Sequence, residues 1–151
     1  MSSRREFVKT ISTASAALGC GVALTSMLQS CATIKFVPKE LVDKKIILSK
    51  TEFAEHKFVI AINKQLPAPI YVFFSEKEND YIASLMTCAH LGCELKPTGS
   101  FLTCPCHGSE FSNQGKVLNG SADVALTSYQ VEVKESEIII IDLTKIRHIE
   151  E

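Results

Sequence analysis

The chain has 151 residues, of which 46% are hydrophobic and 22% are charged, and its formal net charge is −1. This length and composition suit one packed domain with a short additional segment, and they exclude a largely disordered chain. The nearly neutral balance, without a basic stripe, also excludes a typical nucleic-acid-binding protein.

Residues 1–30 have the composition of an export signal rather than of a folded domain. Arg4 and Arg5 stand near the start, and no charged residue lies between Lys9 and Lys35. A basic start followed by such an uncharged run is typical of a signal segment, and the stretch SRREFVK closely resembles the twin-arginine consensus. We therefore expect residues 1–30 to be a twin-arginine signal or a helical membrane anchor.

The end of this run contains a candidate lipidation site. In the stretch LQSC, Leu28, Ser30 and Cys31 match a lipobox, whereas Gln29 fits it less well. Three outcomes stay open: a lipid anchor on Cys31, an uncleaved anchor helix within residues 11–28, or a released soluble domain. All three place the folded domain at the outer face of the cytoplasmic membrane or in the periplasm, where disulfides are stable.

Residues 31–43 are expected to form a tether, and the residues after them carry a β signal. Short β-branched or aromatic segments, separated by turn or charged residues, predict strands at 44–49, 57–63, 69–75, 80–86, 127–135 and 137–143. No helical periodicity of three turns appears after residue 44. We therefore expect an all-β antiparallel domain over residues 44–148.

The segment from about residue 87 to residue 120 interrupts this pattern. It is rich in Gly, Cys, His and Pro, and it predicts a loop-built insertion between flanking strands. Within it lie the stretches CAHLGC, residues 88–93, and CPCHGS, residues 104–109. Their four cysteines and two histidines indicate a metal site or a local cross-link. A tetrahedral zinc site and a small iron–sulfur cluster each need four ligands, so two of these six residues are in excess.

The two stretches closely resemble the two cluster-binding boxes of the Rieske iron–sulfur proteins of cytochrome bc complexes. Two boxes at this spacing are a specific signature, and the predicted strands agree with that family's fold, an antiparallel β-sandwich with a loop-built cluster-binding subdomain. The resemblance implies one [2Fe–2S] cluster per chain. Cys88 and Cys104 would then hold one iron, and His90 and His107 would hold the other.

The two remaining cysteines of the boxes, Cys93 and Cys106, correspond to a disulfide between the loops in that family. Two neutral imidazoles in place of thiolates make such a cluster less negative, so its potential lies at about −150 to +300 mV, against about −400 mV for plant-type ferredoxins. The imidazoles also retain a nitrogen that can carry a proton, so electron uptake can be coupled to proton uptake. These properties suit a centre that oxidises a quinol.

Residues beside the boxes are expected to tune the potential. By the resemblance, Leu91 shields the cluster, and the Ser109 hydroxyl donates a hydrogen bond to a bridging sulfide. High-potential relatives carry a Tyr two residues after this Ser, whereas this chain has Phe111. The missing donor predicts a lower potential. The segment 120–123 also lacks the proline of the family's loop, so it matches the quinol-docking surface less well.

Zinc is the main chemical alternative, because the C-x-H and C-x-x-H spacings also serve that metal. The surplus cysteine pair and the export signal fit a zinc site poorly. His56 and His148 lie outside the two boxes, and we expect them to be surface or strand-end histidines.

The sequence therefore predicts an electron-transfer subunit of an oxidoreductase, with no catalytic residue of its own. One hypothesis is the subunit of a membrane quinol-oxidising, cytochrome bc-like complex, with a cytochrome b or c and quinol as partners. The other is an accessory periplasmic subunit of another oxidoreductase, such as a molybdenum enzyme resembling arsenite oxidase. A Rieske oxygenase is not expected, because the chain is too short for a catalytic iron domain.

Overall fold

The computed structural model describes residues 34–149, so the predicted signal segment and Cys31 lie outside the described residues. The elements in chain order are β1 (Phe36–Pro38), β2 (Lys45–Ser49), the 3-10 helix η1 (Lys50–Phe53), β3 (Phe58–Ile62), β4 (Ile70–Ser75), β5 (Asp80–Leu85), β6 (Lys96–Pro97), β7 (Phe101–Thr103), β8 (Glu110–Ser112), β9 (Val117–Asn119), β10 (Ser128–Lys134) and β11 (Ile138–Arg147). The expected all-β class is confirmed. Over residues 34–149, no helix has the length and apolar character needed to cross a membrane.

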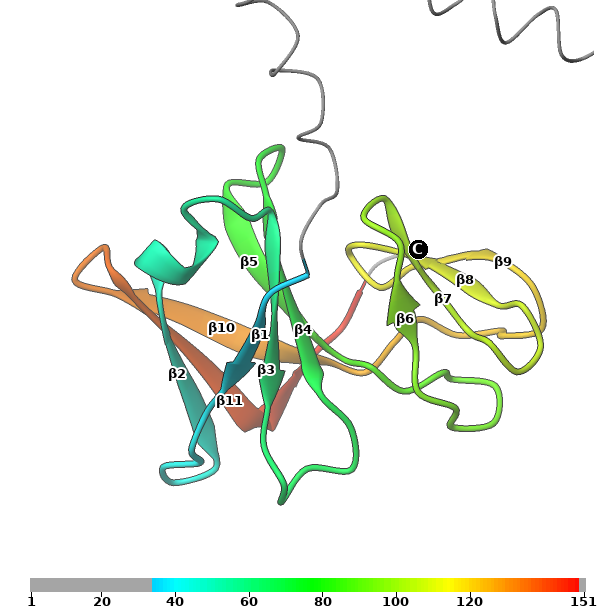
Figure 1. Ribbon diagram of the computed structural model, residues 1–151, viewed down its shortest axis with the longest axis horizontal. Coiled ribbons are helices and arrows are strands. Elements are labelled where there is room, and N and C mark those ends of the chain that lie inside the picture. Colours follow the sequence, from blue (N-terminus) through cyan, green and yellow to red (C-terminus); the bar gives the residue numbers. More distant parts are fainter. Residues whose placement is uncertain (1–33, 150–151) are drawn as a thin grey trace, which may run out of the picture. The chain divides into compact units, whose positions relative to one another are not determined.

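The strands form two sheets, which are separate in Figure 1. The base sheet has seven strands in the order β1-β3-β4-β5-β10-β11-β2, and a smaller sheet has four in the order β6-β7-β8-β9. Neighbouring strands are antiparallel throughout, except that β1 and β3 run parallel. We call residues 86–127, which include the smaller sheet, the loop subdomain.

The central strands of the base sheet are buried on both faces. One face of β3, β4 and β5 contributes Val59, Val72 and Ala83 to a core enclosed by the base sheet. The opposite face of β3 and β4 contributes Ile60 and Tyr71 to a second core shared with the loop subdomain. Because successive side chains of a strand point to opposite faces, burial of both faces explains apolar runs such as FVIAI and IYVFFS.

The loop subdomain is inserted between two strands that are neighbours in the base sheet. The chain leaves β5 and returns in β10, where Ser84 and Ser128 are directly paired. Their buried hydroxyls lie 2.7 Å apart and form a hydrogen bond. The insertion was expected to consist of loops, but it contains four short strands. The residues buried in its core include Leu95, Leu102 and Phe111.

The tether expected over residues 31–43 is shorter than predicted, because β1 lies within it and pairs with β3. Lys39 Nζ forms an ion pair of 2.8 Å with Glu52 of η1, and Lys35 Nζ donates to the Glu52 carbonyl at 2.9 Å. The prediction missed β1 because three residues carry little periodicity. Pro38 lies in β1, and proline is tolerated in edge strands such as this one.

Candidate metal centre

The two Cys/His stretches form loops with matching backbone hydrogen bonds. In the first loop the Cys88 N–H donates to the Cys93 carbonyl at 2.8 Å. In the second loop the Cys104 N–H donates to the Ser109 carbonyl, also at 2.8 Å. Each bond therefore joins a cysteine to the residue five positions later, so the two loops present their side chains from equivalent backbone positions.

A tight turn inside each loop completes this match. The Gly92 N–H donates to the Cys88 carbonyl at 2.9 Å, and the Gly108 N–H donates to the Cys104 carbonyl at 3.1 Å. Gly92 and Gly108 have φ values of 77° and 74°, a left-handed conformation that glycine adopts without steric cost. The sequence Gly-Cys in one box and Gly-Ser in the other therefore has a common structural reason.

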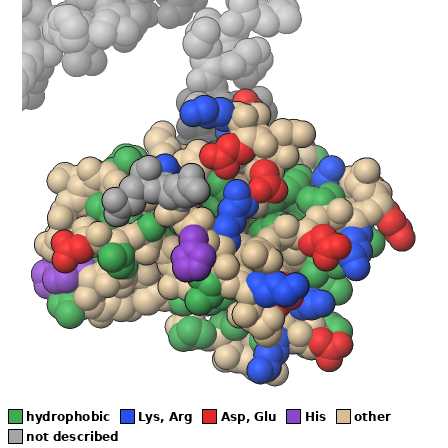
Figure 2. Space-filling model, turned by 180° about the vertical axis from the view of Figure 1, so that it is seen from behind, with side chains coloured by type: hydrophobic (Ala, Val, Ile, Leu, Met, Phe, Trp, Pro, Cys, Tyr) green, Lys and Arg blue, Asp and Glu red, His purple; other side chains and the backbone are tan. Residues whose placement is uncertain are grey.

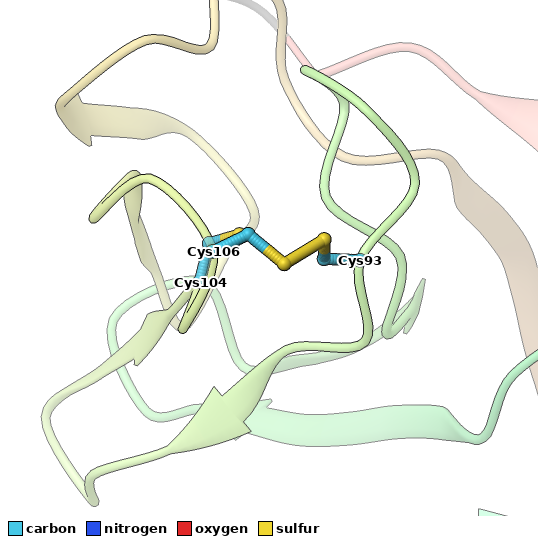
Figure 3. A group of neighbouring side chains, drawn as sticks. All are labelled: Cys93, Cys104 and Cys106. Carbon is cyan, nitrogen blue, oxygen red and sulfur yellow. A yellow bond between two sulfur atoms is a disulfide. The ribbon is translucent and has the colours of Figure 1, made fainter.

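A disulfide between Cys93 and Cys106 joins the two loops, with their Cα atoms 6.6 Å apart (Figure 3). This is the pairing implied by the resemblance. The sulfur atoms of Cys93, Cys104 and Cys106 all lie within 4.8 Å of one another, as ligands of one metal would. Because Cys93 and Cys106 are oxidised to each other, neither offers a thiolate, and Cys104 is the one of these three that could bind a metal.

Cys88 and Cys104 are free thiols, and each is only 2% exposed. Burial opposes the charged form of Cys104, but hydrogen bonds from the Cys106 and His107 backbone and from the Cys88 thiol outweigh it. Together they hold the pKa of Cys104 below its ordinary value. Since the thiolate is the form that binds metal, these hydrogen bonds favour the form of Cys104 that a metal would need.

The two loop histidines lie on the exposed side of the same loops. The ring centroids of His90 and His107 are 4.9 Å apart, with an angle of 80° between the rings. Both residues are exposed, in contrast to the two buried thiols. The four candidate ligands thus fall into a buried sulfur pair and an exposed imidazole pair, with one member of each pair from each loop.

Ser109 provides an independent test of whether a cluster fits between these loops. Its side chain is fully buried, and Ser109 Oγ has no hydrogen-bond partner among the described residues. A buried hydroxyl without a partner costs about 1–3 kcal/mol, so it points to an acceptor that the protein chain does not supply. The sulfide of a cluster is such an acceptor, and the residues present therefore fit the group that the resemblance implies.

Three large apolar side chains of the loop subdomain are exposed. Leu91 follows His90 in the first loop and is 68% exposed. Leu118 of β9 and Val124 are 57% and 60% exposed. Figure 2 shows apolar side chains beside a histidine on the left, the side of the loop subdomain in that view. The exposed Leu91 lies next to His90 in the sequence, so it gives the first loop an apolar side chain that a partner can contact.

Phe111 and the two remaining histidines occupy different environments. Phe111 of β8 is fully buried and faces Leu102 of β7 in the small sheet. His148 is exposed and His56 is half-buried, and neither lies in the two loops.

The sequence prediction missed a polar link between the loop subdomain and the base sheet. The buried Tyr71 hydroxyl of β4 donates to Asn113 Oδ1 at 2.9 Å, and Asn113 Nδ2 donates to the Gly99 carbonyl at 3.2 Å. Burial raises the pKa of Tyr71, so this phenol remains a hydrogen-bond donor. No local motif marks either side chain, because the link joins residues far apart in the sequence.

Comparisons with known proteins agree with this geometry. The Rieske [2Fe-2S] domain family matches residues 35–130. The cytochrome b6-f complex iron-sulfur subunit 3 of Nostoc sp. strain PCC 7120 is 30% identical over 150 residues, which cover 91% of this chain and 84% of the relative. The chloroplastic cytochrome b6-f complex iron-sulfur subunit of Fritillaria agrestis is 41% identical over 56 residues, 35% of this chain and 24% of the relative.

A solved structure shows a similar fold. The crystal structure of the plasma membrane Rieske protein PetC3 from the cyanobacterium Synechocystis PCC 6803 superposes with a TM-score of 0.52 at 26% identity. The superposition covers 61% of this chain and 93% of that protein. The expected antiparallel β-sandwich with an inserted subdomain is therefore confirmed.

Proposed function

The chain belongs to the Rieske [2Fe-2S] domain family, and from this membership we propose that its two free thiols and its two loop histidines are the ligands of its cluster. The family implies one [2Fe–2S] cluster per chain, and the chain is an electron-transfer protein related to cytochrome b6-f Rieske subunits. The proposed ligands are Cys88 and Cys104 for one iron, and His90 and His107 for the other. The observation that carries this assignment is the pair of matched loops, joined by a disulfide that removes the other two cysteines from the ligand set.

The four proposed ligands differ in exposure, and this difference gives them different roles. When bound, the cluster accepts and gives up one electron. Cys88 and Cys104 are buried, so water is kept away from the sulfur ligands. His90 and His107 are exposed, so they are the ligands that a partner can reach. An imidazole that binds a metal through one ring nitrogen still offers the other for a hydrogen bond or a proton.

The partner that we propose is a membrane quinol-oxidising complex of the cytochrome bc type. The exposed Leu91 supports this choice, because an apolar side chain next to His90 suits docking to an apolar protein surface. The relatives from Nostoc and Fritillaria are iron-sulfur subunits of cytochrome b6-f complexes. No feature of residues 34–149 favours the alternative molybdenum enzyme.

The proposed location is the outer face of the membrane, with the N-terminal segment as the export signal or anchor. The Cys93–Cys106 disulfide supports this location, because structural disulfides persist in oxidising compartments and are rare in the cytosol. PetC3 of Synechocystis PCC 6803 is described as a plasma membrane protein.

Spectroscopy and iron and sulfide analysis of the purified full-length protein test whether the chain holds the cluster. We expect visible absorption and a low-temperature EPR signal of the reduced protein, with two irons and two inorganic sulfides per chain, as the cluster formula requires. A colourless, EPR-silent protein that contains zinc would contradict the proposal.

Isolation from detergent-solubilised membranes tests the partner. An affinity-tagged full-length chain is expected to retain a cytochrome b, seen in the haem spectrum, and to be reduced when a quinol is added to that complex. Co-purification with a molybdenum subunit instead, without haem, would reject the quinol-oxidising assignment while leaving the cluster assignment intact.

A further inference from the structure

The segment that follows β9 lies in backbone contact with the second cluster loop. Gly120 has a φ of 100°, and a Cβ atom placed on it would lie 2.5 Å from the Cα and 2.9 Å from the nitrogen of Ser109. The same Cβ atom would lie 3.0 Å from the Gly108 carbonyl oxygen. Favourable contacts between carbon atoms lie at about 3.5–4.0 Å. Because all three neighbours are backbone atoms, no side-chain rotation can relieve this overlap.

Ser109 is held from its other side as well. Its carbonyl accepts the 2.8 Å hydrogen bond from the Cys104 N–H. On the Gly120 side, Glu110 pairs with Asn119 at the end of the β8–β9 ladder, which places Gly120 against Ser109 one step farther along. Ser109 therefore lies between the backbone of Cys104 and the backbone of Gly120.

The position of the Ser109 backbone matters for the cluster because it determines where the Ser109 hydroxyl lies. Ser109 Oγ is buried and has no partner among the described residues, so the cluster that the two loops are proposed to hold would supply its acceptor. Hydrogen-bond strength falls when donor and acceptor leave a narrow range of distance and angle. A displacement of the Ser109 backbone would therefore weaken the bond of its hydroxyl without removing the hydroxyl.

We propose that Gly120 is a positioning residue for the redox centre, because its lack of a side chain holds Ser109 at the distance from which its hydroxyl stabilises the reduced cluster. This inference rests on the proposed ligand set. It makes Gly120, the first residue of the segment 120–123, part of the tuning of the cluster. Gly120 acts through the backbone of Gly108 and Ser109, since it has no side chain of its own.

Redox titration of purified Gly120→Ala, Ser109→Ala and the double variant tests the proposal. Each single variant is expected to shift the midpoint potential downward, because the reduced and more negative state loses hydrogen-bond stabilisation. The double variant should have the potential of Ser109→Ala, since a hydroxyl that is absent cannot be displaced. An unchanged potential in Gly120→Ala would overturn the proposal, and so would an equal shift with and without the Ser109 hydroxyl.

Gly99→Ala is the matched control. Gly99 has a φ of 93°, close to that of Gly120, but a Cβ placed on it meets nothing within 4 Å. This variant should lower the unfolding temperature through backbone strain and leave the midpoint potential unchanged. A potential shift equal to that of Gly120→Ala would assign the effect to strain and reject the contact with Ser109.

Cluster retention decides the case in which Gly120→Ala cannot be titrated. Loss of the visible absorption in Gly120→Ala, with retention in Gly99→Ala, would support the need for free space beside Ser109. Loss of the visible absorption in both variants would overturn the need for free space beside Ser109. The wild-type spectrum separates this inference from the proposed function: a wild-type protein without a Rieske signal refutes the function, whereas a normal signal with unresponsive variants refutes only the role of Gly120.

Discussion

The base sheet and the loop subdomain are stabilised by different interactions. The base sheet has strands of up to ten residues, and its core is closed by apolar side chains from all seven strands and η1. The strands of the loop subdomain have only two or three residues, and a disulfide joins its two cluster loops. Long ladders and apolar burial suffice for the first region, whereas short strands require cross-links. The two regions should therefore respond differently to substitution.

Removal of a thiolate ligand is expected to have the largest effect, which is loss of the cluster. This effect should be limited to the loop subdomain. Cys104→Ser should lose the cluster completely, because a serine hydroxyl does not replace a thiolate on iron. Iron analysis and visible absorption measure the loss, and far-UV circular dichroism should still show the β signal of the base sheet. Retention of a full cluster would remove Cys104 from the ligand set.

A cavity in the core of the base sheet should have the opposite effect: it should lower the stability and leave the cluster unchanged. Ile141 of β11 is fully buried, and Ile141→Ala is expected to lower the free energy of unfolding by about 2–5 kcal/mol through lost burial and a residual cavity. Chemical denaturation measures this change, and the midpoint potential should remain that of the wild type. A shifted potential would show that the two regions are more tightly coupled than their separate cores suggest.

Loss of the disulfide should weaken the loop subdomain alone. The bond joins cysteines 13 positions apart, and closing a loop of about 15 residues stabilises a fold by about 3 kcal/mol in the chain-entropy account. In Cys93→Ala/Cys106→Ala we expect faster amide hydrogen exchange within residues 86–127 and faster loss of the visible absorption. Equal acceleration of exchange in β3 and β4 would contradict a local effect.

An added hydroxyl should change the potential rather than the stability. Phe111→Tyr supplies the donor that high-potential relatives have, and it should raise the midpoint potential by roughly 60 mV if the new bond favours the reduced state by about 1.4 kcal/mol. Tyr71→Phe is the converse change in the same core, and it removes a hydroxyl bonded to Asn113. It should cost about 1 kcal/mol of stability and leave the potential unchanged. A potential that does not move in Phe111→Tyr would reject the role given to residue 111.

The smallest expected effect is a gain of stability in the base sheet. Glu135 and Ser136 connect β10 to β11 with φ values of 50° and 57°, which non-glycine residues rarely adopt. A two-residue hairpin of this kind favours Asn-Gly, so Glu135→Asn/Ser136→Gly should raise the free energy of unfolding by about 0.5–1 kcal/mol. Thermal unfolding measures the gain, and a decrease would mean that the native side chains make compensating contacts.

The difference between the two regions also explains what the sequence could predict. Strands of the base sheet were predicted nearly to their ends, such as residues 127–135 for Ser128–Lys134, because their apolar residues recur over several positions. The cluster boxes were recognised because their ligands lie close together in the sequence. Strands of two or three residues carry no such periodicity, and their pairing depends on neighbouring segments. The contact between Gly120 and Ser109 is likewise nonlocal, so no sequence window contains it.

The paired positions Ser84 and Ser128, where the chain leaves and re-enters the base sheet, give the redox centre a modular character. Since both ends of the insertion lie side by side, its length and chemistry can change without altering the register of any base strand. Mutations that retune the centre therefore need not be matched by changes in the scaffold. The same scaffold can then be kept while the potential of its inserted centre evolves to suit a new electron donor or acceptor.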